Sequence, residues 1–124
     1  MIKSLLFFLL LSTKTLASWG NELPGEYQQG KCMTFATAYA DTHPGSRMIV
    51  WVHEQYAHII IYTADGAFVD NLHPSPIRQP RGLNVWASNN GYDINGWSIM
   101  TVIDYDHQSD QDRAVIAWLK QHER

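Results

Sequence analysis

Two apolar segments on either side of a tight-turn signal constrain the fold more than any other feature of the sequence. Residues 58–63 are mostly apolar and β-branched, and a second apolar run at residues 67–72 follows Asp65-Gly66. An Asp-Gly pair between such runs is a strong signal for a β-hairpin. We therefore expect two neighbouring antiparallel strands. Two further runs have strand character, at residues 48–52 and 97–103.

Helical patterns lie at both ends of this strand region. Residues 32–42 are rich in Ala with apolar side chains at helical spacing, and Pro44-Gly45 ends the pattern. Ser109 is a typical helix N-cap for a terminal helix, with acidic residues in the turn that follows. Residues 86–96 are polar and hold several Asn and Gly residues, which indicates a long surface loop. The order of helix, antiparallel strands and helix predicts the α+β class.

The amino-terminal segment has the pattern of a secretory signal peptide. Lys3 supplies a positive charge, residues 5–11 are an unbroken apolar run, and Thr15 and Ala17 are small residues before a cut. The apolar run is shorter than the about 20 residues that an ordinary membrane-spanning helix needs. We predict a cleaved signal peptide over residues 1–17. Lys14, close to the cut, keeps an uncleaved anchor as the alternative.

The remaining chain, residues 18–124, is long enough for one small domain with a modest core. Its predicted export places this domain in the periplasm or outside the cell, with no stable membrane span after cleavage of the signal. The net charge of the whole sequence is −3 and its basic residues are scattered, so nothing indicates a surface for nucleic acid.

Cys32 is the single cysteine of the sequence. In an oxidising environment it can form no internal disulfide, so it is an intermolecular bridge, a buried apolar residue or a reactive thiol. Lys31 precedes it and the predicted helix follows, which places the thiol at a helix N-terminus, where the dipole favours the thiolate. Gln28 and Gln29 are candidate donors to an oxyanion, against the simpler interpretation that they are solvated.

A histidine and an aspartate stand out in the two strands of the hairpin. His58 opens an almost wholly apolar strand, and Asp70 lies among apolar residues where β propensity disfavours it. With Cys32 they match the nucleophile, base and orienting carboxylate of a triad. A two-residue turn would place Asp70 opposite Ile61, so contact with His58 requires a longer turn or a bulge. If the turn has two residues, His73 is the alternative base.

Three motifs carry a family resemblance. Cys32 heads an Ala-rich helix, residues 57–61 read Ala-His-Ile-Ile-Ile, and residues 68–72 read Phe-Val-Asp-Asn-Leu. Together they resemble the bacterial transglutaminase-like cysteine peptidases. The resemblance implies a papain-like α+β fold in which the cysteine-bearing helix packs on an antiparallel sheet. It also implies that Cys32 is the nucleophile, His58 the base and Asp70 the orienting group.

A second family has a similar arrangement. The NlpC/P60-type cell-wall peptidases also use a histidine strand, a hairpin and a polar third residue, and here Asp70 follows His58 by 12 positions. In that family the catalytic cysteine is usually preceded by Asp, whereas Lys31 precedes Cys32 in this chain. The NlpC/P60 resemblance therefore ranks second.

The motifs predict an exported thiol hydrolase that cleaves or transfers a peptide or isopeptide bond. Its partner would be a peptide or protein substrate in the envelope or outside the cell, with peptidoglycan as one candidate. No cofactor is expected, and no metal, because His53 and His58 lack the spacing of a helical two-histidine site. The alternatives are a non-catalytic papain-like binding module and an NlpC/P60-type peptidoglycan endopeptidase.

Overall fold

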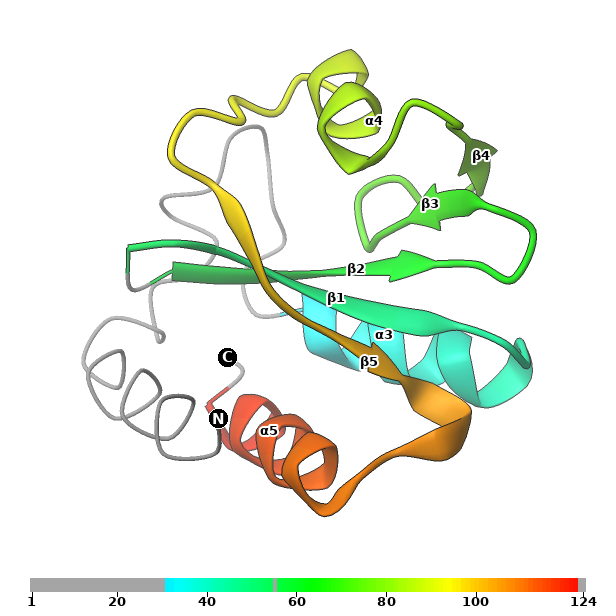
Figure 1. Ribbon diagram of the computed structural model, residues 1–124, viewed down its shortest axis with the longest axis vertical. Coiled ribbons are helices and arrows are strands. Elements are labelled where there is room, and N and C mark those ends of the chain that lie inside the picture. Colours follow the sequence, from blue (N-terminus) through cyan, green and yellow to red (C-terminus); the bar gives the residue numbers. More distant parts are fainter. Residues whose placement is uncertain (1–30, 55, 123–124) are drawn as a thin grey trace.

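The computed structural model describes residues 31–54 and 56–122, in which helices flank an antiparallel sheet (Figure 1). The elements in chain order are α3 (Cys32–Thr42), β1 (Arg47–His53), β2 (Tyr56–Tyr62), β3 (Ala67–Val69), β4 (Ile77–Arg78), α4 (Leu83–Asn89), β5 (Ser98–Asp104), the 3-10 helix η1 (Tyr105–His107) and α5 (Asp110–Gln121). Within these residues the sheet has five strands in the order β4-β3-β2-β1-β5, and all neighbours are antiparallel. The predicted α+β class is confirmed.

Different helices cover the two faces of the sheet (Figure 1). In β2, Ala57 and Ile59 belong to a core that α3 and α5 share, whereas Ile60 belongs to a second core beneath α4. Successive side chains of a strand alternate between faces, so His58 points to the α4 side. Its cross-strand partner Trp51 lies in the α4 core as well. Because both faces are covered, the central strands are almost wholly apolar, with His58 as the buried polar exception in β2.

The β2–β3 hairpin turns through three residues, 64–66, which is longer than the two-residue turn that Asp65-Gly66 alone would suggest. The Thr63 N–H donates to the Ala67 carbonyl at 2.8 Å and closes the loop. Gly66 has φ of 87°, the left-handed conformation that glycine adopts without strain. Three-residue hairpin loops commonly end on a residue of this kind. Asp65-Gly66 therefore signals the hairpin but not its length.

The extra loop residue moves Asp70 to the other face of the sheet, because a shift of one residue reverses every side chain of a strand. Ile61 pairs with Val69, so the register continues with Asp70 level with Ile60 rather than with Ile61. Since Ile60 and His58 share a face, Asp70 is a diagonal neighbour of His58. The longer turn that this contact requires is present.

β3 ends at Val69, three residues earlier than the sequence predicts, because the chain turns at once. The backbone N–H of Asp70 donates to the carbonyl of His73 at 3.1 Å, and the reverse bond is also 3.1 Å. Pairing between β2 and β3 therefore covers only the last two residues of β2. Among the described residues, no strand pairs with this edge of β2 at the level of His58.

The segment expected to be a surface loop, residues 86–96, contributes to the core. In α4, Leu83, Trp86 and Ala87 form one buried face, and Tyr92 beyond the helix is only 4% exposed. The loop interpretation is wrong for residues 86–89, which belong to α4, because polar residues on the exposed side hide the i, i+3, i+4 spacing of the buried ones, whereas residues 90–96 form neither helix nor strand.

The terminal helix α5 is capped by Ser109, as predicted. The Ser109 hydroxyl accepts from the Asp112 N–H, and the Asp112 carboxylate accepts from the Ser109 N–H, both at 3.0 Å. Val115, Ile116 and Leu119 bury the inner side of the helix against the core that it shares with α3. Within residues 31–54 and 56–122, no helix has the length and apolar surface needed to cross a membrane.

Candidate active site

A buried carboxylate begins the turn after β3. Asp70 Oδ1 accepts hydrogen bonds from the backbone N–H groups of Leu72, at 3.2 Å, and His73, at 2.8 Å. The His73 ring also contacts this oxygen through Nδ1, at 2.9 Å. An aspartate that binds its own following backbone stabilises a turn. This explains locally why an acidic residue occurs in an otherwise apolar segment.

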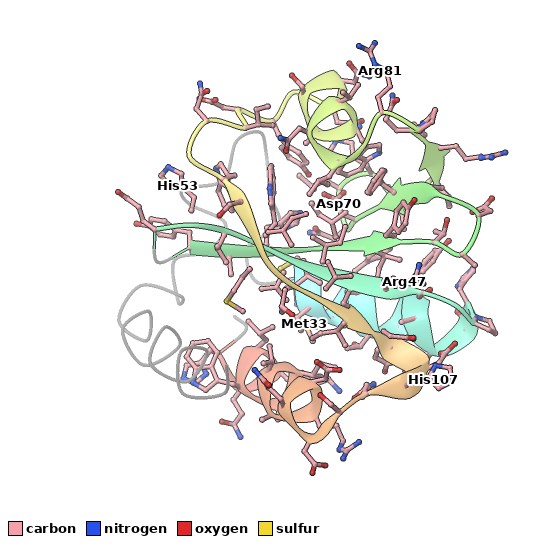
Figure 2. The ribbon with its side chains drawn as sticks, in the orientation of Figure 1. Met33, Arg47, His53, Asp70, Arg81 and His107 are labelled. Carbon is pink, nitrogen blue, oxygen red and sulfur yellow. The ribbon has the colours of Figure 1, made fainter. Side chains whose placement is uncertain are left out.

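The second oxygen of Asp70 faces β2 and the segment after α4. His58 Nε2 lies 2.8 Å from Oδ2, and the Tyr92 hydroxyl donates to Oδ2 at 2.5 Å. The side chains of His58 and Asp70 are completely buried. Figure 2 shows Asp70 on the side of β2 that α4 covers. The structure thus brings together the predicted histidine and aspartate, and adds His73 and Tyr92. We call these four residues the Asp70 cluster.

Asp70 is ionised at neutral pH. Burial by itself raises the pKa of a carboxyl group, because the charged form loses its solvation by water. The hydrogen bond and charge of His58, the hydrogen bond of Tyr92 and the charge of His73 outweigh burial and hold the pKa of Asp70 well below its usual range. The carboxylate is therefore a hydrogen-bond acceptor only.

The charge on Asp70 determines which ring nitrogens carry protons. Since Asp70 can only accept, His58 carries a proton on Nε2 and His73 carries one on Nδ1. The lone pair of a neutral His58 is then on Nδ1. This is the tautomer that a general base has when a carboxylate holds its opposite nitrogen.

Cys32 is the first residue of α3, as predicted, and is 3% exposed. It belongs to the core on the α3 face, together with Ala57 and Ile59, the neighbours of His58 in β2. α3 packs against β2, and Figure 1 shows the two elements running in the same direction. The cysteine and the histidine therefore lie on opposite faces of the sheet.

β3 ends before it reaches the level of His58. Next to His58, the edge of β2 is paired with no strand in the described part of the chain, because β3 reaches only Ile61 and Tyr62. A contact between Cys32 and His58 at this edge stays a prediction.

The other sequence candidates lie elsewhere. Gln28 and Gln29, and the signal peptide over residues 1–17, are outside the described residues and stay predictions. His53 packs its ring against Trp97, with centroids 5.4 Å apart. In the part of the chain that the structure describes, no three His, Cys, Asp or Glu side chains are grouped so that they could hold a metal ion.

Tyr92 carries no signal in the sequence that links it to Asp70. Its position depends on the turn after α4, where Gly91 has φ of 88° and the Tyr92 N–H donates to the Ala87 carbonyl at 3.0 Å. This turn brings the chain back over the sheet, where the Tyr92 ring packs against Trp86 with centroids 6.0 Å apart. Only the burial of a tyrosine, whose hydroxyl needs a partner, could have indicated the contact.

In comparisons with known proteins, no protein-family model, curated protein or solved structure matches the chain.

Proposed function

We propose that the chain is an exported thiol hydrolase of papain-like architecture that acts on a peptide or isopeptide bond. Cys32 is the nucleophile, His58 the base and Asp70 the orienting carboxylate. The observation that carries the proposal is the 2.8 Å hydrogen bond between the completely buried side chains of His58 and Asp70. This bond fixes the imidazole tautomer that a thiol nucleophile requires, as in other triads.

The proposed reaction follows from these roles. The Cys32 thiol transfers its proton to His58 Nδ1 and attacks the carbonyl carbon of the substrate. The carbon–nitrogen bond of the tetrahedral intermediate then breaks, while His58 protonates the leaving amine. Water, activated by His58, hydrolyses the thioester and releases Cys32, or a second amine takes the place of water and the acyl group is transferred.

The position of Cys32 supports its role as nucleophile. The first turn of α3 contains no acidic residue, so the positive end of the helix dipole acts on the thiol without local compensation and favours the thiolate. Lys31 adds a positive charge directly before it. The resemblance to transglutaminase-like peptidases and the predicted signal peptide support a periplasmic or secreted enzyme, with envelope peptides, peptidoglycan among them, as candidate substrates.

A non-catalytic papain-like binding module is the second candidate, and the burial of Cys32 favours it. An apolar environment disfavours the thiolate, and the core that contains Cys32 lies across the sheet from the core that His58 faces. In that case the Asp70 cluster serves only to hold the turn after β3.

Alkylation with iodoacetamide at pH 7, followed by mass spectrometry of the intact protein, separates the two candidates. We expect Cys32 to react about tenfold faster than free cysteine, because thiolate character controls the rate. His58→Gln should remove this advantage. His107→Gln is the matched control, since His107 is 82% exposed and lies outside the Asp70 cluster. A wild-type thiol slower than free cysteine, or equal rates in both variants, would support the binding module.

Turnover tests the proposed substrate class. Wild-type protein and Cys32→Ala should be incubated with peptidoglycan fragments and with isopeptide-linked peptides, and the products identified by mass spectrometry. We expect cleavage by the wild type alone. Equal product formation by Cys32→Ala would exclude Cys32 as the nucleophile.

A further inference from the structure

Three members of the Asp70 cluster bond one another in a closed ring. Tyr92 donates to Asp70 Oδ2 at 2.5 Å, His73 Nδ1 lies 2.9 Å from Asp70 Oδ1, and His73 Nδ1 lies 3.1 Å from the Tyr92 oxygen. The Tyr92 proton points to Asp70, so the Tyr92 oxygen is the acceptor of the third contact. Each group therefore restrains the orientation of the other two.

This ring determines which oxygen of Asp70 faces which partner. A carboxylate can exchange its two oxygens by rotating about its last side-chain bond, a torsion with broad preferences. Here Oδ1 is held by His73 and the turn backbone, and Oδ2 is held by Tyr92. The oxygen that Tyr92 holds is the same one that bonds His58 Nε2. Rotation of the carboxylate is opposed from both sides.

The supporting rings are themselves fixed by packing. The His73 ring meets Trp86 edge-on at 5.7 Å and Tyr92 edge-on at 5.3 Å. The Tyr92 ring contacts Trp51 at 6.0 Å and meets the edge of His58 at 6.0 Å. These contacts tie the cluster to Trp86 of α4 and Trp51 of β1, a helix and a strand of the fold. A site held by such elements keeps its geometry better than one held by loops.

We infer that Tyr92 and His73 are positioning residues, which lock Asp70 in the orientation that presents Oδ2 to His58. The inference rests on the proposed function, because it assigns these residues a role through the orienting carboxylate. Neither residue takes part in bond making. Their effect is to keep the His58 proton on Nε2 and its lone pair on Nδ1. In the proposed reaction, Nδ1 is the atom that accepts the proton of the Cys32 thiol.

The test removes single hydrogen-bonding groups and measures two properties. In Tyr92→Phe the ring and its packing stay, and only the hydroxyl is lost. His73→Ala removes the donor to Oδ1, whereas His73→Asn restores a donor at nearly the same place. Tyr62→Phe is the matched control, because Tyr62 packs on the α4 core outside the Asp70 cluster. The measurements are the rate of Cys32 alkylation by iodoacetamide and the tautomer of His58 from imidazole nitrogen chemical shifts.

We expect Tyr92→Phe and His73→Ala to lower the alkylation rate about tenfold, which is typical for loss of a group that orients a functional side chain. The His58 nitrogen shifts should move from the single Nε2–H form towards a mixture of tautomers. His73→Asn should restore both properties to nearly wild-type values, and Tyr62→Phe should leave both unchanged. A purely structural role would lower the melting temperature without changing the tautomer.

Two outcomes would overturn the inference: an unchanged His58 tautomer in Tyr92→Phe and His73→Ala, or no recovery in His73→Asn when its fold is intact. The proposed function fails in a different way. If wild-type Cys32 proves unreactive, the alkylation readout is lost but the nitrogen shifts of His58 still decide whether Tyr92 and His73 position it.

Discussion

At the scale of single residues, Asp70 links turn formation to the proposed chemistry. Its Oδ1 binds the backbone of the turn that ends β3, and its Oδ2 binds the buried His58 ring. A buried charge is destabilising unless its hydrogen-bonding capacity is met. The N–H groups of the turn satisfy Oδ1 of Asp70, and the His58 ring and the Tyr92 hydroxyl satisfy Oδ2. Loss of the charge should therefore affect stability and the proposed site together.

Asp70→Asn should lower the free energy of unfolding by about 3 kcal/mol at pH 7, because charged hydrogen bonds in a buried cluster are lost. The pKa of Asp70 is lowered in the folded protein. Its ionised form therefore stabilises the fold above the ordinary Asp pKa of about 3.9, and this stabilisation is lost as the pH falls below that value towards the folded-state pKa.

Urea unfolding of the wild type and Asp70→Asn at pH 7 and at pH 3 measures the effect. The difference between the two proteins should shrink at the lower pH. Asp93→Asn is the control, since Asp93 is exposed and should show only a small difference at either pH. A difference for Asp70→Asn that stays constant with pH would contradict the role assigned to the charge.

At the scale of elements, the loop between β2 and β3 decides whether a site can form. Its third residue, Gly66, sets the register that brings Asp70 to the face of His58. A second glycine, Gly45, lies between α3 and β1 with φ of 83°, and it approaches the same loop at Ala64. The two glycines share a backbone conformation but differ in the space around them, so they allow strain and crowding to be separated.

Gly66→Ala should lower the free energy of unfolding by about 1 kcal/mol, the cost of left-handed backbone for a residue with a side chain. Its new methyl group would have only the Tyr62 hydroxyl nearby, at 3.7 Å. Gly45→Ala should cost about 3 kcal/mol, because its methyl group would also lie 2.8 Å from the Ala64 side chain. Urea midpoints of the two variants test this order, and equal losses would show that crowding at Ala64 is relieved without cost.

The sequence is sufficient to predict those helices and turns whose signals come from neighbouring residues. Ser109 and Asp112 form a capping box from neighbouring residues, and α3 begins at Cys32 because alanine-rich helical spacing needs no distant partner. The hairpin length depends instead on how Thr63 and Ala67 bond across the loop, and a difference of one residue reverses the face of Asp70. Contacts across the fold are less accessible still. Tyr92 reaches Asp70 across 22 positions, and no local pattern encodes that distance.

At the scale of the whole molecule, the sheet separates two cores with different contents. The α3 and α5 side is built mainly from aliphatic residues and contains Cys32. The α4 side contains aromatic rings and surrounds the Asp70 cluster (Figure 2). The proposed triad therefore draws its nucleophile from one layer and its base and carboxylate from the other. Changes in the two layers should differ in their effect on His58.

Trp86→Ala should lower the free energy of unfolding by about 4 kcal/mol, because it empties a large buried site in the α4 core. Trp118 of α5 is only partly buried, so Trp118→Ala should lower the free energy of unfolding by about 1–2 kcal/mol.

Trp86 also contacts the rings of His73 and Tyr92, with centroids 5.7 and 6.0 Å away. Its loss should therefore change the imidazole nitrogen shifts of His58 under conditions where the protein is still folded, while Trp118→Ala leaves them as in the wild type. Urea unfolding and imidazole nitrogen shifts, measured for both variants, test whether only the α4 core supports His58. If Trp118→Ala disturbed His58 as strongly as Trp86→Ala, the α4 core would not be the structure that supports the Asp70 cluster.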